Sequence, residues 1–208
     1  QEQAKKMGDD AATLAAKQGA GTRVYSAVDE LEQKAKAWQE HLPGAFNAAI
    51  GPYNSDPAFQ KWTGTMPLIG NKAGYDFHTL MDHDIHKLTA LYREMPSSGR
   101  GAGSDAQDAN FMEAMGAARK AQTPEAFFAI MQSAKQLVRD KAGLPHEFDL
   151  PRAPLHPTDV ALINRYATAK PIKPGSPYQP IAVKSPQEAE ALKPGTYYLT
   201  PDRKVWKR

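Results

Sequence analysis

The sequence contains no cysteine, which excludes disulfide bonds, thiolate metal sites and cysteine nucleophiles. It also lacks a run of about 18 apolar residues, so we expect no membrane-spanning segment. The net charge is small as well, because 26 basic and 23 acidic residues leave an excess of only +3 over 208 residues. Such a small excess gives little support to a protein that binds polyanions over its whole surface.

Motifs of common catalytic sites are also missing. The sequence has neither the G-x-S-x-G motif of a serine nucleophile nor the G-K-[ST] motif of a phosphate loop. Gly99, Gly101 and Gly103 precede a predicted helix start, which is a position that favours anions. No predicted strand precedes these glycines, so a flexible capped linker is the alternative to nucleotide binding. We predict that the chain is not an enzyme and needs no cofactor.

Proline content and periodicity divide the chain into four parts. We predict N-terminal helices for residues 1–43 and a helical bundle for residues 44–145. For residues 146–180 we predict a proline-rich extended arm with one short helix, since 11 of the 17 prolines follow residue 144. We expect this arm to lie across neighbouring subunits. Residues 181–208 predict a small β-α-β-β module. The expected fold class is mainly α, with a coiled-coil-like N-terminal helix.

The clearest periodicity is an apolar stripe in which spacings of four and three residues alternate. Its members are Val24, Val28, Leu31, Ala35, Trp38 and Leu42. The stripe predicts a helix that begins after the glycines at 19–21, follows a separate alanine-rich helix, and carries Asp29 and Glu32 on its solvent faces. Either the stripe is a seam between copies in a homo-oligomer, or the helix is an ordinary amphipathic one packed on its own domain. We predict the seam as the basis of a homo-oligomer.

A predicted helix over residues 75–95 carries the segment FHTLMDHDIHKL. His78 and His86 lie about 12 Å apart along such a helix, which is too far for one ion. Asp82 or His83 together with His86 can chelate, so these three are the candidate metal ligands, although a third ligand must come from elsewhere. An ion-paired helix face and a pH-responsive contact are the alternatives. We predict no metal site, and a metal-binding or hydrolytic domain stays an alternative function.

The final residues, SPQEAEALKPGTYYLTPDRKVWKR, predict a compact unit. Ser185 and Glu188 have the spacing of a capping box, which begins a short helix. Residues 196–199 and 205–207 read as the strands of a hairpin, and residues 181–183 as one more strand. A module of this size buries little apolar surface, so we expect it to dock on another surface.

The end of this module combines aromatic and basic residues. The candidate docking residues are Tyr197, Tyr198, Trp206, Arg203, Lys204, Lys207 and Arg208. Three roles are open for them. The rings can form the module's own core while the charges protect a sheet edge. Alternatively, the rings stack on nucleic-acid bases while the charges bind phosphates, or the whole surface docks on an acidic protein.

Two segments resemble a known family. Residues 97–132, SSGRGAGSDAQDANFMEAMGAARKAQTPEAFFAIMQ, resemble a glycine-rich loop, a helix and a second helix opened by T-P-E-A in large tailed-phage virion proteins. The matching positions are Gly101, Gly103, Ser104, Asp105, Asp108 and residues 123–126. Residues 183–208 are similar to another phage-virion ending, S-x-x-E-A-x-x-L-x-x-G-T followed by T-P-D-G-[KR], in which Arg203 replaces the usual glycine. The family comprises tape measure proteins and internal DNA-ejection proteins.

This resemblance implies a structural protein of the phage virion, made in the bacterial host cytoplasm and present in several copies. Its expected partners are other virion proteins of the tail tube, the hub or the portal region, and its expected role is in genome delivery. The chain opens on Gln1, so we expect a processed product or part of a longer polypeptide. Some proteins of this family carry a lytic transglycosylase domain elsewhere in the chain, but this sequence has no transglycosylase catalytic motif, so the resemblance does not imply that activity here. A DNA-binding accessory protein that uses the basic C-terminus is the remaining alternative.

Overall fold

The computed structural model describes residues 2–50, 72–96, 102–151 and 153–208, with the backbone alone for residues 2–9 and 102–104. The described part is mainly helical with a small three-stranded sheet, which confirms the predicted fold class. The helices are α1 (Glu2–His41), α2 (Pro43–Ala49), α4 (Lys72–Arg93), α5 (Ala102–Arg119), α6 (Pro124–Ala142), α7 (Pro157–Tyr166) and α8 (Pro186–Glu190). The strands are β1 (Ile181–Ala182), β2 (Tyr197–Leu199) and β3 (Val205–Lys207).

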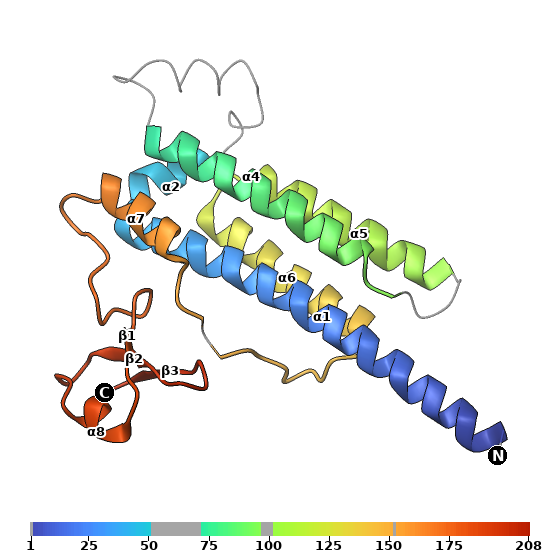
Figure 1. Cartoon of the computed structure of the whole chain (residues 1–208). Coiled ribbons are helices and arrows are strands. Elements are labelled where there is room, and N and C mark those ends of the chain that lie inside the picture. Colours follow the sequence, from blue (N-terminus) through green and yellow to red (C-terminus); the bar gives the residue numbers. More distant parts are fainter. Residues whose placement is uncertain (1, 51–71, 97–101, 152) are drawn as a thin grey trace.

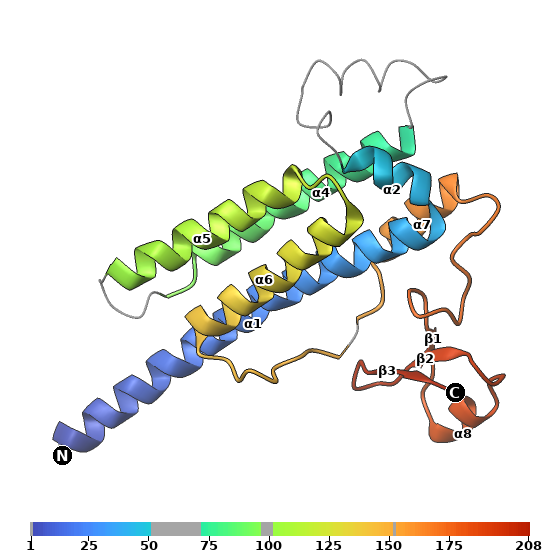
Figure 2. The same ribbon diagram turned by 180° about the vertical axis from the view of Figure 1, so that it is seen from behind.

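The long helices α1, α4, α5 and α6 form an elongated bundle (Figure 1). α1 packs along α6, α5 packs on α6, and α4 packs on α1 and α2. The core is rich in aromatic rings, and those of Tyr92 and Phe111 stack with centroids 3.8 Å apart. Figure 2 shows the same bundle from behind, with the first turns of α1 projecting beyond the other helices.

The ends of α6 follow from its sequence. The Thr123 hydroxyl accepts a hydrogen bond from the Ala126 backbone N–H at 3.2 Å, as expected of an N-cap residue. Gly143 ends the helix with φ 65°, a left-handed conformation that glycine adopts at low cost. Both boundaries are therefore encoded by residues at the helix ends.

α1 is a single helix through residues 19–21, where the sequence predicted a break between two helices. Gly21 is buried, and a Cβ built on it would lie 2.1 Å from the Cβ of Ala142 on α6. The same Cβ would lie 3.5 Å from the terminal methyl of Met95. Gly21 therefore marks a close approach between α1 and α6 instead of a helix end.

Replacing Gly21 by alanine is expected to lower the free energy of unfolding by about 1–3 kcal/mol, because α1 and α6 must separate to admit the methyl group. Gly19 provides a matched control, since no heavy atom lies within 4 Å of a Cβ built there. Gly19→Ala is expected to raise stability by about 0.5–1 kcal/mol through helix propensity. Urea unfolding measures both variants, and effects of the same sign would contradict the close approach.

The apolar stripe of α1 lies inside the chain's own core. Its first five members, Val24, Val28, Leu31, Ala35 and Trp38, are 0–1% exposed. The sixth, Leu42, is partly buried and packs against the same core. α4, α6 and α7 of the same chain pack along this helix. The structure thus corrects the predicted intermolecular seam, and the amphipathic helix packed on its own domain accounts for the pattern.

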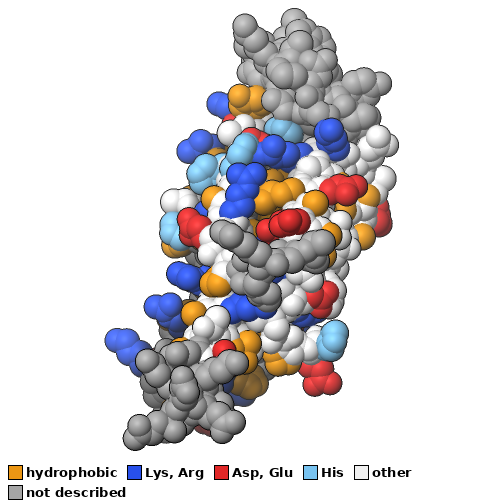
Figure 3. Space-filling view, turned by 90° about the vertical axis from the view of Figure 1, so that its right-hand side faces the viewer, with side chains coloured by type: hydrophobic (Ala, Val, Ile, Leu, Met, Phe, Trp, Pro, Cys, Tyr) orange, Lys and Arg blue, Asp and Glu red, His pale blue; other side chains and the backbone are white. Residues whose placement is uncertain are grey.

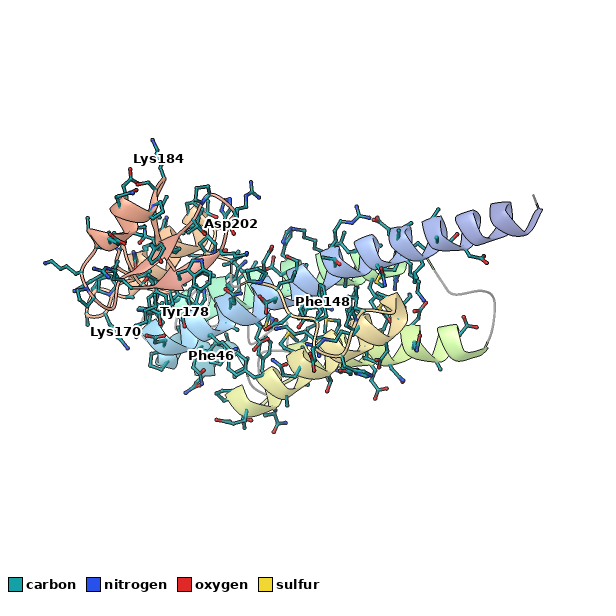
Figure 4. All side chains as sticks on the ribbon, turned by 90° about the horizontal axis from the view of Figure 1, so that it is seen from below. Phe46, Phe148, Lys170, Tyr178, Lys184 and Asp202 are labelled. Atoms are coloured by element: carbon teal, nitrogen blue, oxygen red, sulfur yellow. The ribbon has the colours of Figure 1, made fainter. Side chains whose placement is uncertain are left out.

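The proline-rich residues 146–180 lie on the chain's own helices, which corrects the expectation that they cross neighbouring subunits. Phe148 packs edge-on against Tyr25 of α1, with ring centroids 5.1 Å apart. The Phe148 carbonyl oxygen accepts two hydrogen bonds from the Arg139 guanidinium of α6, at 2.8 and 3.1 Å. Figure 4 shows Phe148 beside the middle of α1 and near α6, and Tyr178 near the C-terminal end of α1.

Side chains and turns satisfy the backbone of this arm, in which prolines supply no N–H donor. The Asn164 side chain on α7 donates to the Ile172 carbonyl at 3.0 Å and accepts from the Ile172 N–H at 2.6 Å. The Leu155 N–H donates to the Tyr178 carbonyl at 3.1 Å, and the Tyr178 hydroxyl donates to Glu40 at 2.9 Å. Leu155, Ile172 and Tyr178 belong to the bundle's hydrophobic core, and this burial is the physical reason that the arm folds back.

An ion pair also fastens the arm to the bundle. Lys34 of α1 lies 2.6 Å from Asp84 of α4 and 3.3 Å from Asp159 of α7, and its side chain is only 11% exposed. Burial alone would lower the pKa of Lys34, but hydrogen bonds to the two carboxylates outweigh it and raise the pKa. A cavity of about 190 Å³ lies beside this lysine, between α1, α4 and residues 153–156.

Candidate functional site

The C-terminal module begins with a helix whose start is encoded by neighbouring residues. The Ser185 hydroxyl accepts a hydrogen bond from the Glu188 N–H at 3.2 Å, and Pro186 occupies the first turn. The Glu188 carboxylate accepts from the Lys184 N–H at 2.7 Å. The predicted capping box therefore forms with one difference, because the glutamate binds the residue before the cap instead of Ser185 itself.

The sheet of this module has the strand order β1-β2-β3, with β1 parallel and β3 antiparallel to β2. The turn between β2 and β3 places Arg203 at φ 62°. This left-handed conformation favours glycine, which is the usual residue here in the phage endings that the sequence resembles. The Thr200 N–H and hydroxyl both donate to the Lys204 carbonyl, at 3.0 and 2.9 Å, and these bonds close the turn.

One face of the sheet carries a row of large side chains. Ile181 pairs with Tyr198, and Tyr198 pairs with Trp206, so the three side chains share a face. Tyr198 is half-buried in the central strand, whereas Trp206 is 52% exposed on the edge strand. The indole of Trp206 therefore presents a large apolar surface to solvent.

Basic side chains flank this exposed tryptophan. Lys204 forms a 3.1 Å pair with Asp202, and both side chains are more than half exposed. The Lys207 ammonium lies 5.7 Å from the centre of the Tyr197 ring, on the other face of the sheet. The Arg208 Nε donates to a backbone carbonyl of the module at 3.2 Å. Exposed contacts of this kind are weak, so these charges can exchange them for contacts with a partner.

The module has a small core of its own. Val183 and Ala189 are buried, at 6% and 8% exposure, yet neither belongs to the hydrophobic core of the bundle. The module joins the arm through the backbone, where the Tyr197 N–H donates to the Gly175 carbonyl at 2.8 Å. A Cβ built on Gly175 would lie 2.8 Å from the Thr196 methyl, so this contact requires glycine. In both ribbon views the module lies beside the bundle, attached through the arm.

The candidate metal ligands on α4 contact other charged or polar side chains. Asp82 lies 2.9 Å from the Arg119 Nε and 3.4 Å from the His86 ring, and Arg119 also contacts the His86 ring at 2.8 Å. His83 is 77% exposed and lies 3.6 Å from Asp84. A cation bound by Asp82 and His86 would have to compete with the Arg119 guanidinium.

Within the described ranges, no three His, Asp or Glu side chains are placed to hold a metal ion together. The contacts of Asp82, His83 and His86 on α4 correspond to an ion-paired helix face, which was an alternative to a metal site there. Figure 3 shows one face of the molecule, on which basic, acidic and histidine side chains are interspersed. Gly99 and Gly101 of the glycine-rich loop lie outside the described residues, and only the backbone of Gly103 and Ser104 is described.

No family model, curated protein or solved structure matches the chain. The resemblance of residues 97–132 and 183–208 to phage virion proteins therefore stays a prediction. None of the described helices is both long and apolar enough to cross a membrane.

A buried ionic cluster between α1 and α6 was missed by the sequence analysis, which placed Glu32 on a solvent face. Glu32 and Lys135 are only 2% and 5% exposed, and the Lys135 ammonium lies 2.6 Å from the Glu32 carboxylate. Lys135 also pairs with Asp29, and Gln132 donates to both Glu32 oxygens at 3.0 Å. A polar cavity of about 480 Å³ opens beside the cluster. These groups satisfy one another, so we assign them a stabilising role.

The cluster makes stability depend on pH. Burial by itself raises the pKa of Glu32, but hydrogen bonds from Lys135 and Lys36 outweigh it and hold the pKa below its ordinary value of 4.5. A carboxyl group of this kind stabilises the fold fully above about pH 5 and loses that contribution as pH falls through its folded-state pKa. The urea midpoint is therefore expected to fall in acid, and less steeply in Glu32→Gln. Equal acid sensitivity of both proteins would contradict this assignment.

Proposed function

We propose that this chain is a structural component of a phage particle, a C-terminal part of a tape measure or DNA-ejection protein. It docks on neighbouring virion proteins of the tail or portal region through its C-terminal module. The observation that carries the docking role is Trp206, which is 52% exposed in a module whose small core is separate from that of the bundle. The phage context comes from the resemblance of residues 97–132 and 183–208.

Physical reasons support docking through this tryptophan. Burying an indole at an interface removes a large apolar surface from water, and tryptophan is enriched among the residues that dominate binding energies. Lys204 and Arg208 flank it along the strand, and Lys207 adds positive charge on the other face of the sheet; this charge steers an acidic partner and discourages self-association. The bundle would hold the module in place, and reversible docking would retain and then release the parent polypeptide during genome delivery.

The test uses particles purified from the bacterial host that makes the protein. Quantitative mass spectrometry is expected to find the chain at a constant ratio to the major virion proteins. Trp206→Ala is expected to reduce the copies retained per particle. Leu14→Ala is the control, because Leu14 is 49% exposed in the N-terminal half of α1. The N-terminal end of this helix projects away from the module (Figure 1), so loss of Leu14 is expected to have no effect.

Two results would overturn the proposal. One is the absence of the chain from purified particles. The other is an equal loss of copies with Trp206→Ala and Leu14→Ala, since it would show that any exposed apolar residue matters equally.

The metal-binding alternative gains no support from the described residues.

A further inference from the structure

The outer edge of β3 has backbone groups that no strand among the described residues uses. β3 is the last strand in the order β1-β2-β3. The Thr200 N–H donates to the Lys204 carbonyl, and the Arg208 N–H donates to the Thr196 carbonyl. Because inward and outward groups alternate along an antiparallel strand, residues 204, 206 and 208 face β2. The N–H and C=O groups of Val205 and Lys207 therefore face outward.

The side chains along this edge alternate as well. Residues two positions apart lie on one face of a strand, so Lys204, Trp206 and Arg208 form a basic-aromatic-basic row. Val205 and Lys207 lie on the opposite face, where Lys207 covers the Tyr197 ring. The exposed row thus has an apolar centre and a positive charge on each side.

We propose that β3 binds an extended segment of another virion protein as a fourth strand, and that this segment carries the pattern acidic-x-apolar-x-acidic. This inference rests on the proposed docking function and names the partner's chemistry. Val205 and Lys207 supply the backbone hydrogen bonds. Trp206 packs against the apolar residue, and Lys204 and Arg208 pair with the two acidic residues. The pattern is symmetric, so it fits either strand direction.

A second copy of the same edge fits this site poorly. If two β3 strands paired antiparallel with Trp206 opposite Trp206, Lys204 of each copy would face Arg208 of the other. Like charges directly opposite each other on neighbouring strands are destabilising. The positive row therefore selects against self-pairing and for an acidic strand.

The experiment measures binding of labelled synthetic peptides to the full chain by fluorescence anisotropy. One peptide has glutamates two positions before and after a central valine, in a threonine-rich background that favours strands. A second has lysines in place of the glutamates. A third has proline in place of the valine and of the threonine on each side of it, which removes the N–H donors toward β3 in either strand direction. We expect the acidic peptide to bind at least about tenfold more tightly than either of the others.

Three variants test the named residues. Trp206→Ala is expected to weaken binding of the acidic peptide by about tenfold or more. Val205→Pro removes one outward N–H and is expected to weaken binding without loss of the bonds to β2. The double variant Lys204→Glu and Arg208→Glu is expected to reverse the preference, so that the lysine peptide binds best. Circular dichroism confirms that each variant is folded.

Several results would overturn the inference. These are equal binding of the acidic and lysine peptides, tight binding of the proline peptide, and Trp206-dependent binding of single-stranded DNA without binding of the acidic peptide. The last would assign the edge to nucleic acid. Failure of the peptides while particles still retain the chain would reject this partner and leave the proposed function standing. Peptide binding by a chain absent from particles would reject the proposed function instead.

Discussion

Lys135→Ala is expected to lower the free energy of unfolding by about 3–5 kcal/mol, because it removes the buried cation of Glu32 and leaves that carboxylate with only the more exposed Lys36. Glu32 has a side chain only 3% exposed and lies 2.6 Å from the Lys135 ammonium, which also pairs with Asp29. The polar cavity beside the cluster is large enough for water, but a side chain so little exposed is solvated only in part. Urea unfolding at neutral pH measures the loss.

Two further variants test whether the buried charge causes this loss. Lys36 also pairs with Glu32, but its side chain is 41% exposed, so Lys36→Ala is expected to cost less than about 1 kcal/mol. Adding Glu32→Gln to Lys135→Ala removes the carboxylate that has lost its buried cation and is expected to recover part of the stability. A double variant less stable than Lys135→Ala would show that lost packing of the lysine stem, and not charge, causes the effect.

Features encoded by residues close together in the chain could be predicted from the sequence. Thr123 begins α6 and Gly143 ends it, Ser185 begins α8, and the hairpin of residues 197–207 forms where its turn signals lie. Each depends on hydrogen bonds within a few residues. Contacts with distant parts of the chain therefore have little effect on where these helices begin or end and where the hairpin turns.

Features that depend on what covers a surface could not be predicted in this way. The spacing of Val24, Val28 and Leu31 shows that a face of α1 is buried, but not whether its own chain or another covers it. Gly21 was interpreted as part of a break, because only the position of Ala142 shows that two helices meet there. Glu32 was expected in solvent, since nothing in the local sequence reveals that Lys135 lies above it.

The exposure of side chains in the candidate site could not be predicted from the sequence either. The sequence predicted the rings and charges of the module, but not which ring is exposed. Tyr198 and Trp206 lie in one row, yet only Trp206 is largely exposed, because it lies on the edge strand and Tyr198 on the central one. Exposure at an edge is a property of the assembled sheet, and the docking proposal depends on it.

Trp38→Ala is expected to lower the free energy of unfolding by about 3–5 kcal/mol, through lost burial and the cavity that remains. Trp38 is 0% exposed, and its ring lies 5.0 Å from that of Phe77 and 6.5 Å from that of Tyr166. The residue therefore joins α1 to α4 and α7 of the same chain. Thermal and urea unfolding measure the loss.

The same variant separates a core role for Trp38 from a role in an oligomer seam. If the residue packs inside its own chain, light scattering gives the same mass for wild type and Trp38→Ala, and the loss of stability does not depend on protein concentration. If it lines a seam, the mass falls and the loss grows on dilution. Trp38→Phe keeps the ring and removes an indole N–H that has no hydrogen-bond partner among the described residues, so it is expected to cost less than about 1.5 kcal/mol. A homo-oligomer that survives Trp38→Ala unchanged would have to use a surface other than this stripe.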